Sequence, residues 1–357
     1  MARALTLGRG PQPRRHAAAA LAEASPQAAR ERVSSPGEAL RKVEIVDPSS
    51  RAQARSLGYA LLAELLERGV SDETREAAQA SDALAAAIGG ADDDALAADH
   101  ERAFGWAAPP LAGFYLDPER LVGGARTDAL HALLDAAGYT PDLRHRDVEH
   151  LSTGLRALAF LSGAESDARE DGHEGAVEKV EGLSRRLLDE HVLRWLPIFV
   201  LAVRRTGLPF PAAIASELDA LVRSHREALA GPAPRFDLPE PPALLEDDET
   251  GLREIGTYLS APAHAGFVLT REDVARLGRG LNVPRGFGDR TQLIVNLLRS
   301  AARFDALDAL LEALEEEAGA QAEGLAGYGD VTAPWRARID ESRALLRALR
   351  ERAEALP

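Results

Sequence analysis

The side chains best suited to chemistry are histidines and acids, and they gather at two places in the sequence. His145, Glu149 and His150 lie close together, and His191 stands within the segment DEHVLRW. A zinc site takes three or four ligands of this kind. A separation of five residues does not place His145 and His150 on one helical face, and no third ligand is evident. We therefore expect no metal site, and we expect His191 to cap or pack at a helix bend.

Other catalytic signatures are missing from the sequence. It contains no HExxH, Walker A or GxSxG pattern and no defensible nucleophile–base pair. The absence of cysteine excludes disulfides, thiolate metal sites and a cysteine nucleophile. The stretch GRGLNVPRGFGDR at 278–290 can touch phosphate, but it lacks a strand–turn–helix context, so we interpret it as a connection between helices. We predict a protein that is not an enzyme and holds no cofactor; a nucleotide-binding enzyme using residues 278–290 is the weaker alternative.

The composition predicts an all-α protein with an acidic surface. The 357 residues are 45% hydrophobic but only 5% aromatic, and alanine and leucine dominate, which favours helices. The formal net charge is −15, divided as +3 over residues 1–47, −10 over 48–235 and −8 over 236–357. Such acidity argues against nucleic acid as a partner and attracts basic peptides, although it also simply keeps a protein in solution. No apolar run is long enough to span a bilayer, so we expect no membrane insertion, and the missing cysteines suit a reducing compartment without proving one.

The segment from 146 to 205 organises the predicted fold. An apolar stripe that begins at Leu151 has helical spacing, and His150, Gly154 and Ala157 form a stripe of small residues beside it. Small side chains there would let another backbone, or a bound peptide, approach His150. The charged insert 165–182 is expected to connect this helix to the next and to become helical by Glu174.

The second half of that segment predicts a bend between two helices. Pro197 has no N–H group and belongs in the first turn of a helix. A helix ending near Val192 and one starting near Leu196 should therefore meet at a bend that carries Trp195. Gly207 is expected to end the second helix.

The flanking regions divide into a tail, further helices and a linker. Residues 1–47 read as a disordered basic tail, and the weakly hydrophobic segment after Arg14–Arg15 does not make an export signal. Aromatic, proline and glycine residues in 106–119 indicate an irregular loop that either binds a partner or packs as core. Residues 231–249 are proline-rich and acidic, which is typical of a linker. Helices are expected at about 50–69, 71–89, 92–104 and 127–137, around 214–229, and at 250–260, 270–281, 288–303, 305–319 and 334–355.

The last five of these helices have apolar faces that must be buried. We expect a module packed on the rest of the protein or on a partner, and not a flexible tail. Its acids Asp305, Asp308, Glu312 and 315–317 should form a solvated face. The alternative is a lid over a peptide groove that a client displaces.

Three short patterns resemble the signatures of the TorD/DmsD/NarJ family of molybdoenzyme maturation chaperones. The first pattern lies at residues 100–115, the second begins at 149, and the third spans 187–199. Together the resemblance covers about residues 50–231. The matching residues are Phe104, Gly105, Pro110, Tyr115, His150, His191, Trp195, Pro197 and Phe199, with Glu149 in place of an Asp. The departures are Gly113 in the serine position, Gly154 in the position of a Glu, and Leu187 in an aromatic position.

The resemblance implies a TorD-like helical bundle of two subdomains plus a C-terminal helical extension. The expected units are the tail 1–47, a chaperone domain at 48–235 with subdomains of about 48–140 and 146–231, and a linker with a helical module at 236–357. It also implies a cytoplasmic assembly chaperone. Its partner would be an apo molybdenum oxidoreductase catalytic subunit, held by a basic, twin-arginine-type leader peptide until cofactor insertion.

Client contacts are expected in a groove between residues 106–115 and the helix that follows His150. The candidate residues are Phe104, Trp106, Pro110, Tyr115, Glu149, His150, His191 and Trp195. Contact with a guanine nucleotide or with molybdopterin rests on the resemblance alone. The alternative function is a non-catalytic helical scaffold or regulatory subunit of a redox complex that has lost peptide binding, which the glycines at 113 and 154 favour.

Overall fold

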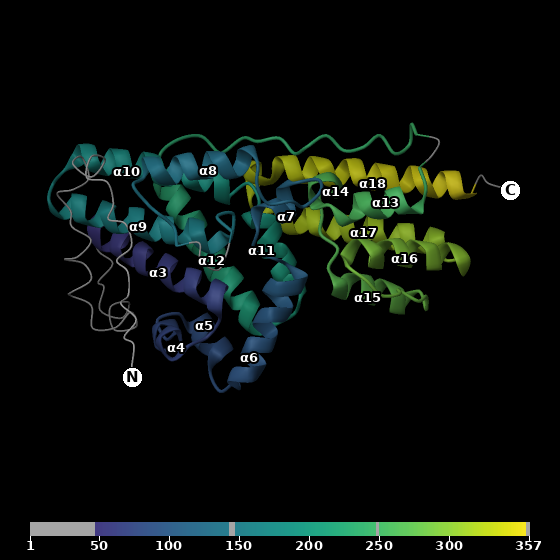
Figure 1. Cartoon of the computed structure of the whole chain (residues 1–357), viewed down its shortest axis with the longest axis horizontal. Coiled ribbons are helices and arrows are strands. Elements are labelled where there is room, and N and C mark those ends of the chain that lie inside the picture. Colours follow the sequence, from purple (N-terminus) through teal and green to yellow (C-terminus); the bar gives the residue numbers. More distant parts are fainter. Residues whose placement is uncertain (1–46, 143–146, 248–249, 355–357) are drawn as a thin grey trace, which may run out of the picture.

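The protein is an elongated assembly of helices (Figure 1). The computed structural model describes residues 47–142, 147–247 and 250–354. Within these ranges the chain is all-α, as expected, and contains no strand beyond an isolated bridge between Leu111 and His150. None of the helices in the described ranges has the length and apolar character needed to cross a membrane. The predictions for residues 1–46, including Arg14–Arg15, and for His145 lie outside the described residues.

The first half of the chain forms the part that we call the core, residues 47–228. Its α-helices are α3 (Pro48–Arg68), α4 (Asp72–Ala78), α5 (Asp82–Ile88), α6 (Asp93–His100), α7 (Ala112–Leu116), α8 (Ala125–Ala136), α9 (Leu151–Glu170), α10 (Glu174–Leu187), α11 (Leu196–Arg205) and α12 (Pro209–Ala228). Two π-helical turns, η2 (Glu101–Ala107) and η3 (Leu188–Val192), join α6 to the following loop and α10 to the bend before α11.

Helices α3 and α9 pack side by side and form the spine of the core. Arg55 Nη2 of α3 donates to Glu165 Oε2 of α9 over 2.7 Å, and Arg156 of α9 donates to Glu64 and Glu67 of α3. Glu165, which is buried, also accepts from Arg169. These ion pairs explain why α9 runs on to Glu170, through a stretch that we expected to be a connection. Because α3 and α9 come from the two expected subdomains, that division stays a proposal.

Several local expectations are corrected by capping. The helix expected from about residue 50 begins at Pro48, because the side chain of Asp47 caps α3 by accepting from the N–H groups of Ser49 and Ser50. The single helix expected at 71–89 is two, because Ser81 accepts from Leu84 N–H and starts α5. The expected bend at Trp195 is present: η3 ends at Val192, and α11 begins at Leu196.

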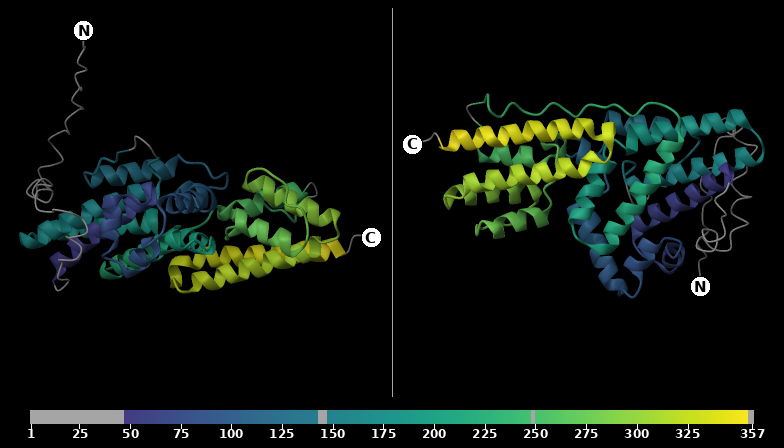
Figure 2. Two further views of the ribbon diagram at one scale, coloured as in Figure 1. Left: turned by 90° about the horizontal axis from the view of Figure 1, so that it is seen from below. Right: turned by 180° about the vertical axis from the view of Figure 1, so that it is seen from behind.

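The second half of the chain forms the part that we call the module, residues 250–354. It comprises α13 (Leu252–Ser260), α14 (Pro262–Ala265), α15 (Arg271–Gly280), α16 (Arg290–Arg303), α17 (Leu307–Ala326), the 3-10 turn η4 (Gly329–Thr332) and α18 (Ala333–Glu354). All five helices expected beyond residue 250 are present, and residues 281–289 connect α15 to α16 as predicted. Long antiparallel helices α17 and α18 lie side by side in both views of Figure 2.

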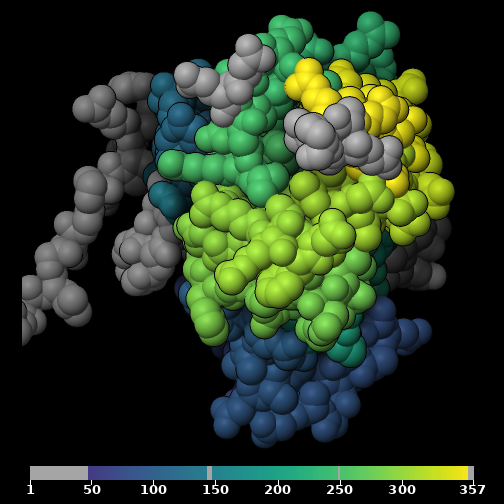
Figure 3. Space-filling model, turned by 90° about the vertical axis from the view of Figure 1, so that its right-hand side faces the viewer, coloured from purple at the N-terminus to yellow at the C-terminus, as the bar shows by residue number. Residues whose placement is uncertain are grey.

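The module packs on the core as we expected. A single cluster of buried apolar side chains extends from Tyr59 in α3 to Leu346 in α18. Trp335 Nε1 of α18 donates to the carbonyl of Arg194 over 2.7 Å. In the space-filling view the module covers one end of the core and borders the α6 region (Figure 3).

Charged side chains reinforce this junction. Arg205 of α11 donates to Asp273 of α15 over 2.7 Å and also pairs with Glu317 of α17. Arg276 contacts the same two carboxylates at 3.1 Å and 2.5 Å. The expectation of a fully solvated acidic face is therefore wrong at Glu317, which is buried because it joins this network.

An extended segment, residues 229–247, connects the two parts along one edge of the molecule (Figure 1). Its backbone carbonyls accept from arginines on both sides: Ala230 from Arg185 over 2.8 Å, and Pro239 from Arg338 over 2.8 Å. Phe236 is buried beneath Arg194, whose guanidinium carbon lies 5.3 Å from the ring centroid. The predicted linker is thus a strap fixed against the core and the module.

Candidate functional site

The first two signatures meet through their backbones. The carbonyl of Pro110 accepts from Leu151 N–H over 2.8 Å, and the carbonyl of Glu149 accepts from Ala112 N–H over 3.3 Å. These bonds flank the bridge between Leu111 and His150. The groove that we expected between residues 106–115 and α9 is therefore closed at Pro110 and Leu151, because the two segments bond directly to each other.

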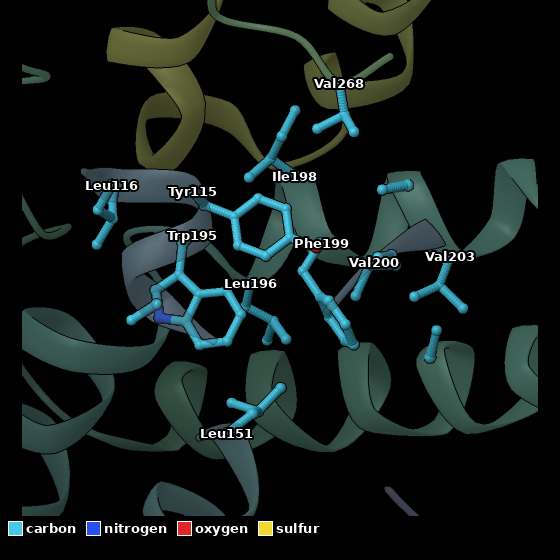
Figure 4. Close-up of a cluster of buried hydrophobic side chains, with 14 of the residues drawn as sticks. Tyr115, Leu116, Leu151, Trp195, Leu196, Ile198, Phe199, Val200, Val203 and Val268 are labelled. Atoms are coloured by element: carbon cyan, nitrogen blue, oxygen red, sulfur yellow. The ribbon is translucent and has the colours of Figure 1, made fainter. Parts of the chain in front are cut away.

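The third signature joins them through aromatic packing (Figure 4). The rings of Tyr115 and Trp195 stack with centroids 5.3 Å apart, and Phe199 contacts both rings edge to face. Trp195 Nε1 donates to the carbonyl of His191 over 2.8 Å, which fixes the indole at the bend. Val268 of the module lies at the same cluster. The signatures therefore build the centre of the fold.

Burial separates the candidate client contacts into two groups. Phe104, Pro110, Tyr115, Glu149 and Trp195 are buried, so their side chains do not offer a surface to a client in this conformation. His150 and His191 are half-buried, and Trp106 is 58% exposed. For the five buried residues a structural role accounts for the signature, because they pack or hydrogen bond within the core.

Glu149 organises the loop between α7 and α8. Its carboxylate accepts from Gly123 N–H over 3.1 Å, from Arg126 Nε over 3.1 Å and from the hydroxyl of Thr127. Together these bonds hold the start of α8 against the segment that precedes α9. A buried carboxylate needs such partners because an unpaired buried charge is costly.

His150 is the N-cap residue of α9. Its Nδ1 accepts from Ser152 N–H at 3.2 Å and lies 2.7 Å from Ser152 Oγ. Ser152 Oγ in turn donates to Glu67 of α3. The small residue Gly154, expected to admit a peptide beside His150, instead faces Val192: a Cβ added there would lie 3.7 Å from the Val192 side chain. The stripe of small residues thus serves helix packing.

His191 sits in η3 with its ring turned into the protein. Its Nε2 is buried and has no hydrogen-bond partner. Burial lowers the pKa of His191 to about 4, so the ring is neutral near pH 7. In the described part of the chain no three His, Cys, Asp or Glu side chains come together as a set that could hold a metal ion. His191 therefore packs at the bend, as expected.

Sequence reasoning missed the surface contacts of residues 104–116, which we call the aromatic segment. Arg271 of α15 lies over the ring of Trp106, with its guanidinium carbon 5.5 Å from the centroid. Arg290 of α16 lies 4.4 Å from the centroid of Phe114. Phe114 is half-buried and was not singled out. The available signal was the pair of arginines at expected helix starts, next to capping residues Thr270 and Asp289.

An open pocket of about 300 Å³ lies between the start of α8, the start of α11 and the strap. Arg126 and Arg194 face it from the core, and Asp237 faces it from the strap. None of the eight candidate residues lines this pocket, whose lining also includes the apolar residues Leu116, Leu238 and Pro239.

The comparisons with known proteins agree with the signatures. Residues 68–201 match the family described as the nitrate reductase delta subunit, which supports the resemblance of this part of the chain to the TorD/DmsD/NarJ family. That family consists of molybdoenzyme maturation chaperones. Neither a search of curated proteins nor a search of solved structures gave a match. The matched residues contain all three signatures, and residues 250–354 lie outside the match.

Proposed function

We propose that the protein is a cytoplasmic assembly chaperone that binds the basic N-terminal peptide of a molybdopterin-dependent oxidoreductase subunit until the cofactor is inserted. The family match of residues 68–201 supports the chaperone role. The observation that carries peptide binding is the exposed indole of Trp106, which already accepts one guanidinium at 5.5 Å. An aromatic face on a protein of net charge −15 suits arginine side chains, which combine positive charge with planar stacking.

Acidic groups beside Trp106 strengthen this proposal. The carboxylate of Glu101 lies close over Gly105: a Cβ added to that glycine would be 2.5 Å from Glu101 Oε1. Glu272, next to Arg271, is exposed. A peptide arginine stacked on Trp106 would thus find carboxylates nearby, and an acidic surface speeds its encounter with the protein.

The second candidate is a non-catalytic scaffold or regulatory subunit of a redox complex. One observation favours it: the loop before α8 closes over Gly113, where a Cβ would lie 2.2 Å from the carbonyl oxygen of Leu121. The family's serine therefore has no room at this position. If the family residue is needed for recognition, this protein has replaced that contact by packing.

The two candidates differ in how long the protein stays with its partner. The test is to remove the gene and to measure the molybdenum content of the source organism's molybdenum oxidoreductases, while quantifying this chain in the purified enzymes. A chaperone is expected to be absent from the mature enzyme, and its loss leaves one client polypeptide without molybdenum. A scaffold is expected to copurify in a fixed ratio. Full molybdenum content in every enzyme of the deletion strain would contradict the proposed chaperone.

A further inference from the structure

Two arginines of the module rest on two aromatic side chains of the aromatic segment. Arg290 lies over Phe114 at 4.4 Å, and Arg271 lies over Trp106 at 5.5 Å. Arg290 also donates from Nη2 to the carbonyl of Ala107 over 2.5 Å, which is a second contact with the same segment. The core thus receives two guanidinium groups at neighbouring places on one short stretch of chain.

The stability of the module's own helices does not explain these positions. Arg271 is the first residue of α15, and Arg290 is the first residue of α16. The N-terminal end of a helix carries partial positive charge, so it favours acids and disfavours cations. Both arginines therefore stand where helix electrostatics oppose them. Arg290 contacts Phe114 and Ala107 of the core, and Arg271 contacts Trp106 of the core and the carbonyl of Gly288 in the module over 2.9 Å.

Arg290 is buried without a carboxylate partner for its guanidinium. Its side chain makes no ion pair with any described residue, although the protein carries excess acid, and its Nη1 has no hydrogen-bond partner. Burial lowers the pKa of Arg290 to about 10. The hydroxyl of Tyr115 is likewise buried without a partner. A guanidinium held by an aromatic face and one carbonyl, without a carboxylate, is easier to replace than a fully paired one.

We propose that the aromatic segment is a receptor for paired arginine side chains and that Arg271 and Arg290 of the module occupy it in cis until a client peptide with two arginines displaces them. This inference rests on the proposed function and deepens it, because it names the chemical groups that are recognised. It also gives the module a role: the module covers the receptor when no client is present.

The exposure of Trp106 provides a way in for the peptide. With 58% of the residue exposed, a peptide guanidinium can reach the indole while Arg271 is still in place. The connection between the two arginines carries Phe287, which is 95% exposed. An apolar residue next to the peptide arginines can contact this ring, so both the cations and their neighbours find complementary groups.

Occupancy in cis lowers the apparent affinity for a peptide. A binding site that is free in only a fraction of molecules binds more weakly by that fraction. Removal of the two arginines should therefore tighten peptide binding. A peptide with lysines in place of arginines should bind more weakly, because an ammonium lacks the planar surface that stacks on Trp106 and Phe114.

The experiment compares two double variants of the full chain. Arg271→Gln with Arg290→Gln removes the cis groups, whereas Arg279→Gln with Arg299→Gln is the matched control. The control arginines lie exposed on the same two helices and change the net charge equally. The probe is a synthetic peptide with two adjacent arginines, and its lysine counterpart is the second probe. Calorimetry measures affinity. A change in tryptophan fluorescence on addition of peptide reports on Trp106, because Trp195 and Trp335 are buried and out of reach of the peptide.

The inference predicts that the first double variant binds the arginine peptide at least about fivefold more tightly than wild type, from two lost cation–π contacts. The control variant should match wild type. Equal or weaker binding by the first variant, with measurable binding by wild type, would overturn occupancy in cis and leave the proposed function standing. Absence of binding by every protein would instead contradict the proposed peptide binding. If Arg290→Gln impairs folding, Arg271→Gln alone must still tighten binding, by a smaller factor.

Discussion

The rings of Tyr115 and Trp195 stack with centroids 5.3 Å apart and an interplanar angle of 19°, which joins the first family signature to the third. Both side chains are almost completely buried. The spacing of these aromatics along the sequence therefore reflects a core in which α7 and the bend before α11 meet. This relationship assigns stability, and not recognition, to most of the signature residues.

Substitution of Trp195 tests that assignment. Trp195→Ala should lower the free energy of unfolding by about 3–5 kcal/mol, because it leaves a large cavity and removes the stack on Tyr115. Denaturant unfolding followed by circular dichroism measures the loss. The control is Trp106→Ala, whose exposed side chain should contribute less than about 1 kcal/mol through its contact with Arg271. Similar losses in the two variants would contradict the assignment.

His150 allows a cap to be separated from a client contact. His150→Ala removes the side chain that accepts from Ser152 N–H and should cost about 1 kcal/mol of stability. His150→Asn keeps a capping side chain and should keep most of that stability. If His150 contacts the client, both variants lower client maturation, measured as molybdenum content. Maturation that falls only in the alanine variant, in step with stability, would show that the residue acts as a cap alone.

The buried histidines predict a loss of stability in mild acid. Burial lowers the pKa of His191 from 6.5 to about 4 and that of His225 to about 3. The unfolded chain therefore binds protons on these rings as the pH falls below about 6.5, while the folded protein does not, so stability must fall between pH 6.5 and 4.

The measurement is the free energy of unfolding at several pH values across this window. His191→Gln should reduce the slope by up to about 1.4 kcal/mol per pH unit, since it removes one of the titrating groups. Wild-type protein in the same buffers is the control. A slope that does not change in the variant would show that the His191 ring takes up its proton equally in the folded and unfolded states.

The ion pairs at the junction predict how the module detaches. Asp273→Asn weakens the contacts of Arg205 and Arg276 and should make residues 250–354 more susceptible to limited proteolysis, while the core stays protected. Glu272→Gln, at the exposed neighbouring position, is the matched control and should leave the pattern unchanged. Rapid removal of the module from the wild-type protein at the same protease concentration would contradict a packed module.

The sequence predicted the helices well because their apolar periodicity and stop signals are local. The spacing of proline, glycine and leucine predicted the bend at Trp195 and the five helices expected beyond residue 250. It misplaced the end of α9, because the carboxylate of Glu165 is held by Arg55, more than one hundred positions earlier in the chain. A charged stretch looks like a connection until its distant partner is known.

The candidate site was less predictable for the same reason. Exposure decides whether an aromatic residue binds a partner or forms core, and spacing alone does not distinguish Trp106 from Tyr115. The two residues lie within the same short segment, yet one is 58% exposed and the other is fully buried. Arg271 and Arg290 reach the aromatic segment from beyond the strap, so no local pattern could connect them with it.

The most direct test of the account is calorimetry of the full chain with the leader peptide of its client enzyme, at low and at high salt. The account predicts measurable binding at low salt that weakens as salt rises, because the attraction between a basic peptide and an acidic protein is screened. The Trp106→Ala variant should bind the leader more weakly than the wild-type protein at the same salt concentration, while its fold stays intact. No binding of the leader at low salt, by a folded wild-type protein, would contradict the central claim.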